Sequence, residues 1–310
     1  MLNLAKVIKG FESIEKCIYF AEENGLILKS KACKIHKVNM PLVCKRNNSL
    51  GTFQCRKGSC RANSGLSRAK VTWFEKSKIS LPQIFYLMYA YARRWPTADT
   101  RLENFVEGTT LSSCTITDWF NYCREVVVTF QLDQQKQKGK IGGPGKVVQI
   151  DESKFGKRKY NKGRSVEGHW VLGMIEDGSD DLRLEVCPKN DRSADALIPL
   201  IKKHVVEGTT IRTYFWKAYD CLPKHWYLHS KVNHSDPGNP FVAPDDTHTQ
   251  RIESQWRVVK KYFYKENYNH PANFEDILVE FLWRRSVLWK HEDPFKKLME
   301  AIEHIYVLQE

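Results

Sequence analysis

A carboxylate, Asp151, follows directly on a β-branched and apolar stretch of the chain. The residues before it read Val147-Val-Gln-Ile, and a segment rich in Gly and Pro at residues 141–145 precedes them. This composition is typical of a buried central strand, which delivers the side chains at its end to the edge of a sheet. An acid at that place indicates a metal site. The alternative interpretation is a solvated residue at the end of a strand, where Asp151 starts a turn.

Four candidate zinc ligands between residues 33 and 60 are arranged as two short knuckles. Cys33 and His36 form the first knuckle, Cys55 and Cys60 form the second, and a predicted β-hairpin joins them. Thiolate and imidazole are ligands of tetrahedral zinc, and a metal would replace the core that this segment lacks. Four residues separate Cys55 from Cys60 where two are usual, and Cys44 is an alternative ligand. Free cysteines in a strand-rich subdomain are the other interpretation.

The chain carries an excess of positive charge. Its 310 residues include 49 Lys and Arg against 36 Asp and Glu, a formal net charge of +13. This excess indicates a polyanionic partner, with ordinary basic solubility as the alternative. It favours nucleic acid over a membrane, because no apolar run approaches the roughly 20 residues that a spanning helix needs.

Cysteine usage and the N-terminus indicate the compartment. Nine cysteines, an odd number, are spread along a chain too long to need disulfide staples, which favours reduced thiols. Lys6 and Lys9 interrupt what would be the apolar core of a signal peptide. We therefore expect a nuclear or cytoplasmic protein that is not secreted.

The N-terminal half is predicted to consist of two regions. Residues 1–72 comprise a helix over residues 5–26 and then the zinc-ribbon-like module.

Residues 73–130 are predicted to be helical. Ser80 caps a helix that ends before Pro96, and a short helix, a turn at Gly108 and a helix from Ser112 follow. Helix, glycine turn and helix is the order of a helix-turn-helix, which binds DNA. An ordinary helical hairpin gives the same pattern.

Beyond a polar linker at residues 131–145, the pattern becomes α/β. Residues 146–265 are predicted to form three antiparallel strands, a crossover helix, two further strands and a long helix, and residues 266–310 are helical. The strands are expected at residues 146–154, 169–175, 182–188, 209–216 and 226–234. This order is that of a ribonuclease H-like mixed sheet. It places Asp151 on the first strand and Glu253 in the first turn of the last helix.

Four phrases carry a resemblance to a known family. They are Trp73-Phe-Glu-Lys-Ser-Lys-Ile-Ser-Leu, Val148-Gln-Ile-Asp-Glu-Ser-Lys-Phe, Trp216-Lys-Ala-Tyr and His248-Thr-Gln-Arg-Ile-Glu-Ser-Gln-Trp. In these phrases the chain resembles the Merlin-type transposases, eukaryotic relatives of a group of bacterial insertion-sequence transposases. The resemblance covers about residues 30–265. The resemblance implies an N-terminal zinc-ribbon and helix-turn-helix region that binds transposon ends. It also implies a ribonuclease H-like domain that cuts and joins DNA, using two divalent metal ions held by an acidic triad of the DDE type.

By position, Asp151 corresponds to the first acid of the triad and Glu253 to the last. Two divalent ions activate the attacking oxygen and stabilise the leaving oxygen of an in-line displacement at phosphorus. Mg²⁺, or Mn²⁺, is the expected ion, since hard oxygen ligands and a phosphate substrate suit it. Basic residues around these acids are expected to contact DNA phosphates, with a solvated basic surface as the alternative. They are Lys154, Lys157, Arg158, Lys159, Lys162, His248, Arg257 and Lys260.

The sequence departs from the family at the second acid. The family reads Asp-Gly before Trp-Lys-Ala-Tyr, and this chain has Tyr214-Phe215 in that place. A phenol with a pKa of about 10 stays protonated at neutral pH, so it cannot bridge metal ions as a carboxylate does. Asp220 is the nearest other acid, and we expect it to face away from the site.

Three functions from different classes remain. The first is a transposase-derived DNA-binding protein whose strand-transfer chemistry Tyr214 impairs. The second is a non-catalytic DNA-binding module, either a decayed transposase copy or one retained by its host. The third, a zinc-dependent protein-interaction domain, leaves the basic charge unexplained. Transposon ends and target DNA are the expected partners, and the sequence leaves open whether the chain forms homo-oligomers.

Overall fold

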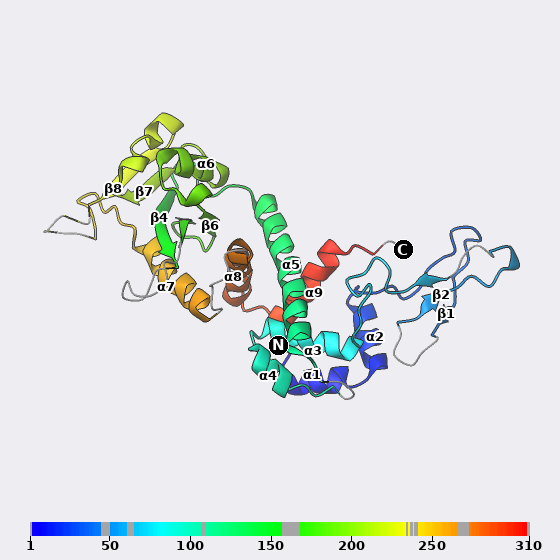
Figure 1. Cartoon of the computed structure of the whole chain (residues 1–310). Coiled ribbons are helices and arrows are strands. Elements are labelled where there is room, and N and C mark those ends of the chain that lie inside the picture. Colours follow the sequence, from blue (N-terminus) through cyan, green and yellow to red (C-terminus); the bar gives the residue numbers. More distant parts are fainter. Residues whose placement is uncertain are drawn as a thin grey trace. The chain divides into compact units, whose positions relative to one another are not determined.

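The computed structural model describes residues 2–44, 50–60, 65–106, 110–156, 168–233, 235, 238, 241–265 and 273–308. The chain divides into two compact units (Figure 1). We call Met1–Phe130 together with Trp283–Glu310 the helical unit, and Gln131–Leu282 the sheet unit. None of the described helices is long and apolar enough to cross a membrane.

The sheet unit contains a five-stranded mixed sheet in the order β6-β5-β4-β7-β8. The strands are β4 (Val147–Phe155), β5 (His169–Glu176), β6 (Leu182–Val186), β7 (Thr210–Tyr214) and β8 (Leu228–Val232). Strands β4, β5 and β6 pair antiparallel, whereas β4, β7 and β8 pair parallel. Helix α6 (Ala194–His204) is the crossover between β6 and β7. This topology confirms the predicted ribonuclease H-like sheet.

Both faces of the central strand β4 are covered, which explains its nearly continuous apolar sequence. Val148 and Ile150 point into a core shared with α6. Because successive strand residues face opposite sides, Phe155 points into a second core, which it shares with α7 (Gln250–Lys265) and the first half of α8 (Phe274–Trp289). The side chains that β4 directs toward α7 therefore include Gln149 and Asp151.

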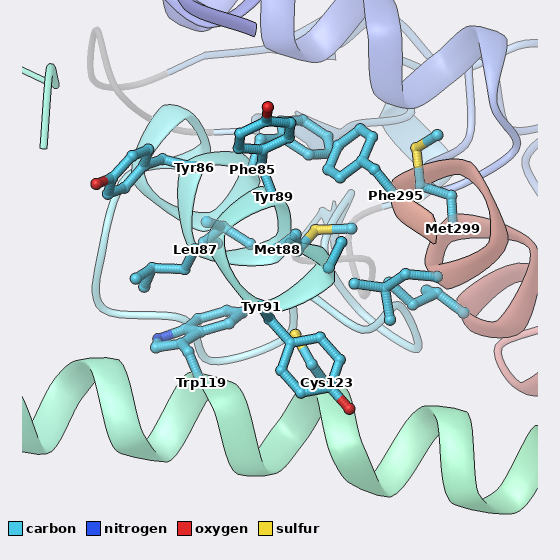
Figure 2. Close-up of a cluster of buried hydrophobic side chains, with 14 of the residues drawn as sticks. Phe85, Tyr86, Leu87, Met88, Tyr89, Tyr91, Trp119, Cys123, Phe295 and Met299 are labelled. Carbon is cyan, nitrogen blue, oxygen red and sulfur yellow. The ribbon is translucent and has the colours of Figure 1, made fainter. Parts of the chain in front are cut away.

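The helical unit is built around α3 (Leu81–Ala92), in which every residue is buried. A helix that is apolar on all sides requires neighbours all round. Figure 2 shows its aromatic and aliphatic side chains packed against Trp119 and Cys123 of α5 (Ser113–Lys138) and against Phe295 and Met299 of α9 (Pro294–Ile305). Ser80 begins α3 with a capping box, as its position before Pro82 predicts.

Three helix boundaries differ from the prediction. The helix expected over residues 5–26 is two helices, α1 (Leu4–Phe11) and α2 (Ile14–Glu23), because Ser13 caps the second through its hydroxyl. The segment expected as a linker continues α5 as far as Lys138, since residues 131–138 contain no Gly or Pro. Residues 103–112 separate α4 (Thr97–Leu102) from α5, which exceeds the three- or four-residue turn of a helix-turn-helix.

A small three-stranded antiparallel sheet lies near the N-terminus. Its strands β1 (Leu42–Val43), β2 (Thr52–Phe53) and β3 (Leu66–Ser67) have two residues each. So few ladder hydrogen bonds and so small an apolar core give little stability of their own. This module needs a further stabilising element.

Candidate functional site

Asp151 lies in the middle of the sheet, on the face that α7 covers. It is half-buried, and it pairs with Gly173 of β5 in the antiparallel register. The indole Nε1–H of Trp256 in α7 donates a hydrogen bond of 2.8 Å to Asp151 Oδ2. Packing is the first role of Trp256, which is buried. Its second role is to orient this carboxylate.

The N-terminus of α7 is attached to the same face of β4. Gln149 Oε1 accepts hydrogen bonds from the backbone N–H of Arg251 at 3.0 Å and of Ile252 at 3.3 Å. These two donors belong to the first turn of α7, which has no intrahelical acceptors for them. Gln149, which lies two residues before Asp151 on β4, therefore fixes where α7 begins.

Glu253 lies between these two attachment points. It follows Ile252 and precedes Trp256 by three residues, a spacing that places Glu253 and Trp256 on neighbouring parts of one helix face. Thr249 Oγ1 donates a hydrogen bond of 2.6 Å to Glu253 Oε1, which restrains the half-buried carboxylate. The structure thus carries the first and last predicted acids on one side of the sheet, Asp151 from the strand and Glu253 from the helix.

Gly173 permits this close approach of α7. A Cβ atom at this position would lie 2.7 Å from Cη2 of Trp256 and 2.9 Å from Cδ1 of Ile252. Both separations are shorter than any ordinary carbon–carbon contact. A glycine inside a strand often marks such an approach, so Gly173 is itself a signal in the sequence for this contact.

Tyr214 ends β7 at the position of the second acid. The last ladder pair between β4 and β7 joins Gln149 to Arg212, so Tyr214 is level with Asp151 along the strands. Its hydroxyl donates a hydrogen bond of 2.7 Å to Glu152 Oε2. Burial and the neighbouring Glu152 charge raise the pKa of Tyr214 far above its usual value. The position predicted for the second acid therefore carries a neutral side chain.

Glu152 is a buried acid beside Asp151 for which the residue pattern predicts no role. Its side chain is fully buried, with Arg192 Nη1 at 3.8 Å from Oε2, and Oε1 has no hydrogen-bond partner among the described residues. Burial raises the pKa of Glu152 to about 7, the Asp151 charge adds to the rise, and Tyr214 and Arg192 oppose it. Because Glu152 follows Asp151 in the strand, it faces the opposite side of the sheet.

The remaining predicted acid and bases lie around this site. Asp220 is exposed and forms an ion pair with Lys231 of β8. Lys154 Nζ lies 5.8 Å from the centre of the Trp170 ring, and Lys260 Nζ lies 5.8 Å from the centre of the Phe155 ring.

His248 lies at the start of α7, where its Nδ1 is 3.5 Å from Gln149 Nε2. Arg257 is exposed on α7. Four further predicted phosphate contacts lie outside the described residues, namely Lys157, Arg158, Lys159 and Lys162.

The four predicted zinc ligands converge in the helical unit. The ligand atoms of Cys33, His36, Cys55 and Cys60 all lie within 4.8 Å of one another. Cys33 Sγ is 3.7 Å from Cys60 Sγ and 3.6 Å from His36 Nδ1, and Cys55 Sγ is 3.5 Å from His36 Nδ1. A tetrahedron with zinc–ligand bonds of about 2.0–2.3 Å has edges of about 3.3–3.8 Å. The cluster therefore has the dimensions of a Cys₃His metal site.

The backbone of this cluster favours ionised sulfur. A hydrogen bond from the backbone N–H of His36 lowers the pKa of the Cys33 thiol to about 6 against the opposing effect of burial. Zinc binds the thiolate, so this turn prepares one ligand for the ion. The fourth cysteine of the segment, Cys44, is exposed and does not belong to the cluster.

The sheet unit is a ribonuclease H-like domain. Its central strand β4 carries Asp151 and has two parallel strands on one side, and α7 carries Glu253. Residues 138–286 match the family model of the ISXO2-like transposase domain. This range contains all five strands with α6 and α7, and the match supports a transposase family of the DDE type. It does not distinguish the Merlin type within that group.

One similar solved structure is the crystal structure of the catalytic core domain of BIV integrase. It is 11% identical in sequence, and the similarity covers 52% of this chain and 97% of that chain with a TM-score of 0.30. No curated protein matches the chain significantly.

Proposed function

We propose that this chain is a transposase-derived DNA-binding protein of the DDE type, of the Merlin group, with impaired DNA cleavage and strand transfer. The observation that supports it most is the attachment of α7 to β4 through Gln149 and Trp256, which holds Glu253 on the side of Asp151. In this proposal the two carboxylates bind Mg²⁺ or Mn²⁺, and Tyr214 supplies no third carboxylate.

The chemistry of the donor set fits a divalent ion in part. Carboxylate oxygens from a strand and from a helix are the hard ligands that Mg²⁺ prefers, and such an ion activates the attacking oxygen and stabilises the leaving one. Trp256 holds Asp151 Oδ2, and Thr249 holds Glu253 Oε1. The Tyr214 hydroxyl is bonded to Glu152 on the other side of β4, so it offers no charge to a second ion.

The helical unit supplies DNA binding in this proposal. The Cys₃His cluster binds Zn²⁺, and the ion stabilises the small sheet. The Lys and Arg side chains of the protein contact the phosphates of transposon ends and target DNA. Because the proposed substrate is DNA, we propose the nucleus as the compartment.

Metal-dependent nicking tests the catalytic part of the proposal. DNA carrying the element's own ends is incubated with Mg²⁺ or Mn²⁺ and the full chain, Tyr214→Asp, or Tyr214→Asp with Asp151→Ala. We expect Tyr214→Asp to gain cleavage that the unchanged chain lacks, because the shorter side chain no longer reaches Glu152 and adds a carboxylate at a position level with Asp151. Adding Asp151→Ala should abolish that gain. Cleavage by the unchanged chain that survives Asp151→Ala would show that other carboxylates bind the metal.

A second candidate is a non-catalytic DNA-binding module. One observation favours it: Tyr214 is part of the packing, with its ring 6.1 Å from Tyr219 and its hydroxyl on the buried Glu152. If Tyr214→Asp binds DNA with the usual salt dependence and never cuts it, this second candidate is correct.

A further inference from the structure

Two large aromatic side chains are exposed at the carboxyl ends of the parallel strands. Phe215 and Trp216 follow β7 directly, and their side chains are 67% and 38% exposed. The backbone N–H of Phe215 donates to Val232 O of β8 at 3.0 Å, so the pairing of the two strands fixes its place. Ligands of open α/β sheets bind outside the carboxyl ends of the strands. Two adjacent exposed rings at that edge indicate a binding surface.

A cation lies against each of these rings. Lys231 Nζ is 5.0 Å from the centre of the Phe215 ring, and the guanidinium carbon of Arg192 is 5.0 Å from the centre of the Trp216 ring. Arg192 also lies 3.7 Å from the centre of the Trp170 ring. A guanidinium packed between two indoles, with the buried Glu152 carboxylate at 3.8 Å, is restrained before any ligand arrives.

Rings and cations together match one class of ligand. An unpaired nucleobase presents a flat π-face to an aromatic ring whatever its identity, and its flanking phosphates attract Lys and Arg. A base inside a duplex is covered by its neighbours, so only an unpaired or flipped base can reach a protein ring. An apolar protein partner would not use the two cations.

We propose that Phe215 and Trp216 form a stacking platform for an unpaired DNA base next to the candidate metal site, with Lys217 beside its flanking phosphates and Lys231, which also pairs with Asp220, beside the Phe215 ring. Lys217 follows Trp216 and is exposed. The platform begins one residue after Tyr214, the position level with Asp151, so it lies at the edge of the sheet where the acids would hold a scissile phosphate. This proposal rests on DNA as the substrate.

The test measures base stacking without cleavage. The full chain is titrated, in Ca²⁺ and without Mg²⁺, with a single strand that carries a 2-aminopurine and with the corresponding duplex. Fluorescence quenching reports stacking of the probe base, and anisotropy reports binding. We expect Phe215→Ala to lose the quenching and to weaken single-strand binding by roughly 5- to 150-fold, the range that loss of one base–aromatic stack gives. Duplex affinity should stay unchanged, and Phe215→Tyr should restore the quenching.

Trp226→Ala is the matched control. Trp226 is 76% exposed and precedes β8, where its carbonyl accepts from Gly208 N before the start of β7. It therefore lies at the amino ends of the same strands, and its loss should leave quenching and affinity unchanged.

Each other outcome overturns the platform. A Phe215→Ala chain that quenches normally, or that loses duplex and single-strand binding equally, contradicts stacking. A change in self-association of Phe215→Ala in light scattering, with unchanged DNA binding, would make this surface a protein interface. Salt-dependent duplex binding by the unchanged chain without any quenching refutes the platform alone. Absence of binding to either DNA refutes the proposed function and the platform together.

Discussion

The Tyr214 hydroxyl donates a hydrogen bond to the carboxylate of Glu152, which lies on the opposite side of β4 from Asp151. A buried carboxylate needs such a partner, because an unsatisfied one costs more than an ordinary hydrogen bond returns. Tyr214 therefore stabilises Glu152 at the position where the sequence comparison predicts a second acid. The same tyrosine is part of the packing of the sheet.

His229 is a second residue whose charge the fold controls. Its Nε2 lies 2.9 Å from Thr213 Oγ1, and burial, helped by Lys231 and opposed by Asp220, lowers its pKa from 6.5 to about 4. Between these two values the unfolded chain takes up a proton and the folded chain does not, so stability falls as pH falls from 6.5 through 4. The full loss is at most about 3 kcal/mol.

Urea unfolding at about pH 7.5 and about pH 5 measures this loss. The variant His229→Gln has no proton to bind, so it should lose less stability between the two pH values than the unchanged chain. An identical loss in both proteins would show that His229 is not the group that titrates.

At the scale of the element, α7 is the helix on which the site depends. Its distance from the sheet is set by Gly173, opposite Asp151. We predict that Gly173→Val destabilises the chain by roughly 1–3 kcal/mol, because the added atoms overpack the contact with Trp256 and Ile252. Chemical denaturation measures the change. Gly10→Ala, where an added Cβ meets nothing within 4 Å, is the control, and an equal effect of both variants would contradict this account.

The zinc-ribbon-like module is the second element whose stability can be tested. With strands of two residues each, it should depend on the metal for its structure. We expect one Zn²⁺ per chain by elemental analysis, and we expect Cys55→Ser to lose the ion and to expose the module to proteases. Cys44→Ser is the matched control, since Cys44 is exposed and outside the cluster. Loss of zinc from Cys44→Ser with retention in Cys55→Ser would contradict the ligand set.

At the scale of the whole molecule, the sequence predicted the parts of the fold that local patterns determine. Apolar runs between turn residues predicted all five strands of the sheet, and the spacing of soft ligands predicted the Cys₃His cluster. The predicted length of α5 was wrong, because the polar composition of residues 131–145 was interpreted as a linker. The first glycine of that segment is Gly139, with φ of 73°, and the helix continues up to Lys138 before it.

Contacts between distant segments could not be predicted in this way. Tyr214 and Glu152 are 62 residues apart in the chain, and only the pairing of β4 with β7 brings them together. The same holds for Trp256 and Asp151, 105 residues apart. A residue-by-residue pattern predicts where a side chain points within its element, and partners across elements follow from the tertiary structure.

Manganese binding tests the central claim most directly, namely that Asp151 and Glu253 form a metal site that Tyr214 leaves incomplete. Calorimetric titration with Mn²⁺ compares the unchanged chain with Tyr214→Asp, with the neutral isostere Tyr214→Asn, and with Tyr214→Asp combined with Asp151→Asn. The account predicts that Tyr214→Asp binds Mn²⁺ roughly tenfold more tightly or better, that Tyr214→Asn does not, and that Asp151→Asn removes the gain. Tight binding of two Mn²⁺ ions by the unchanged chain, unaffected by Asp151→Asn, would contradict it.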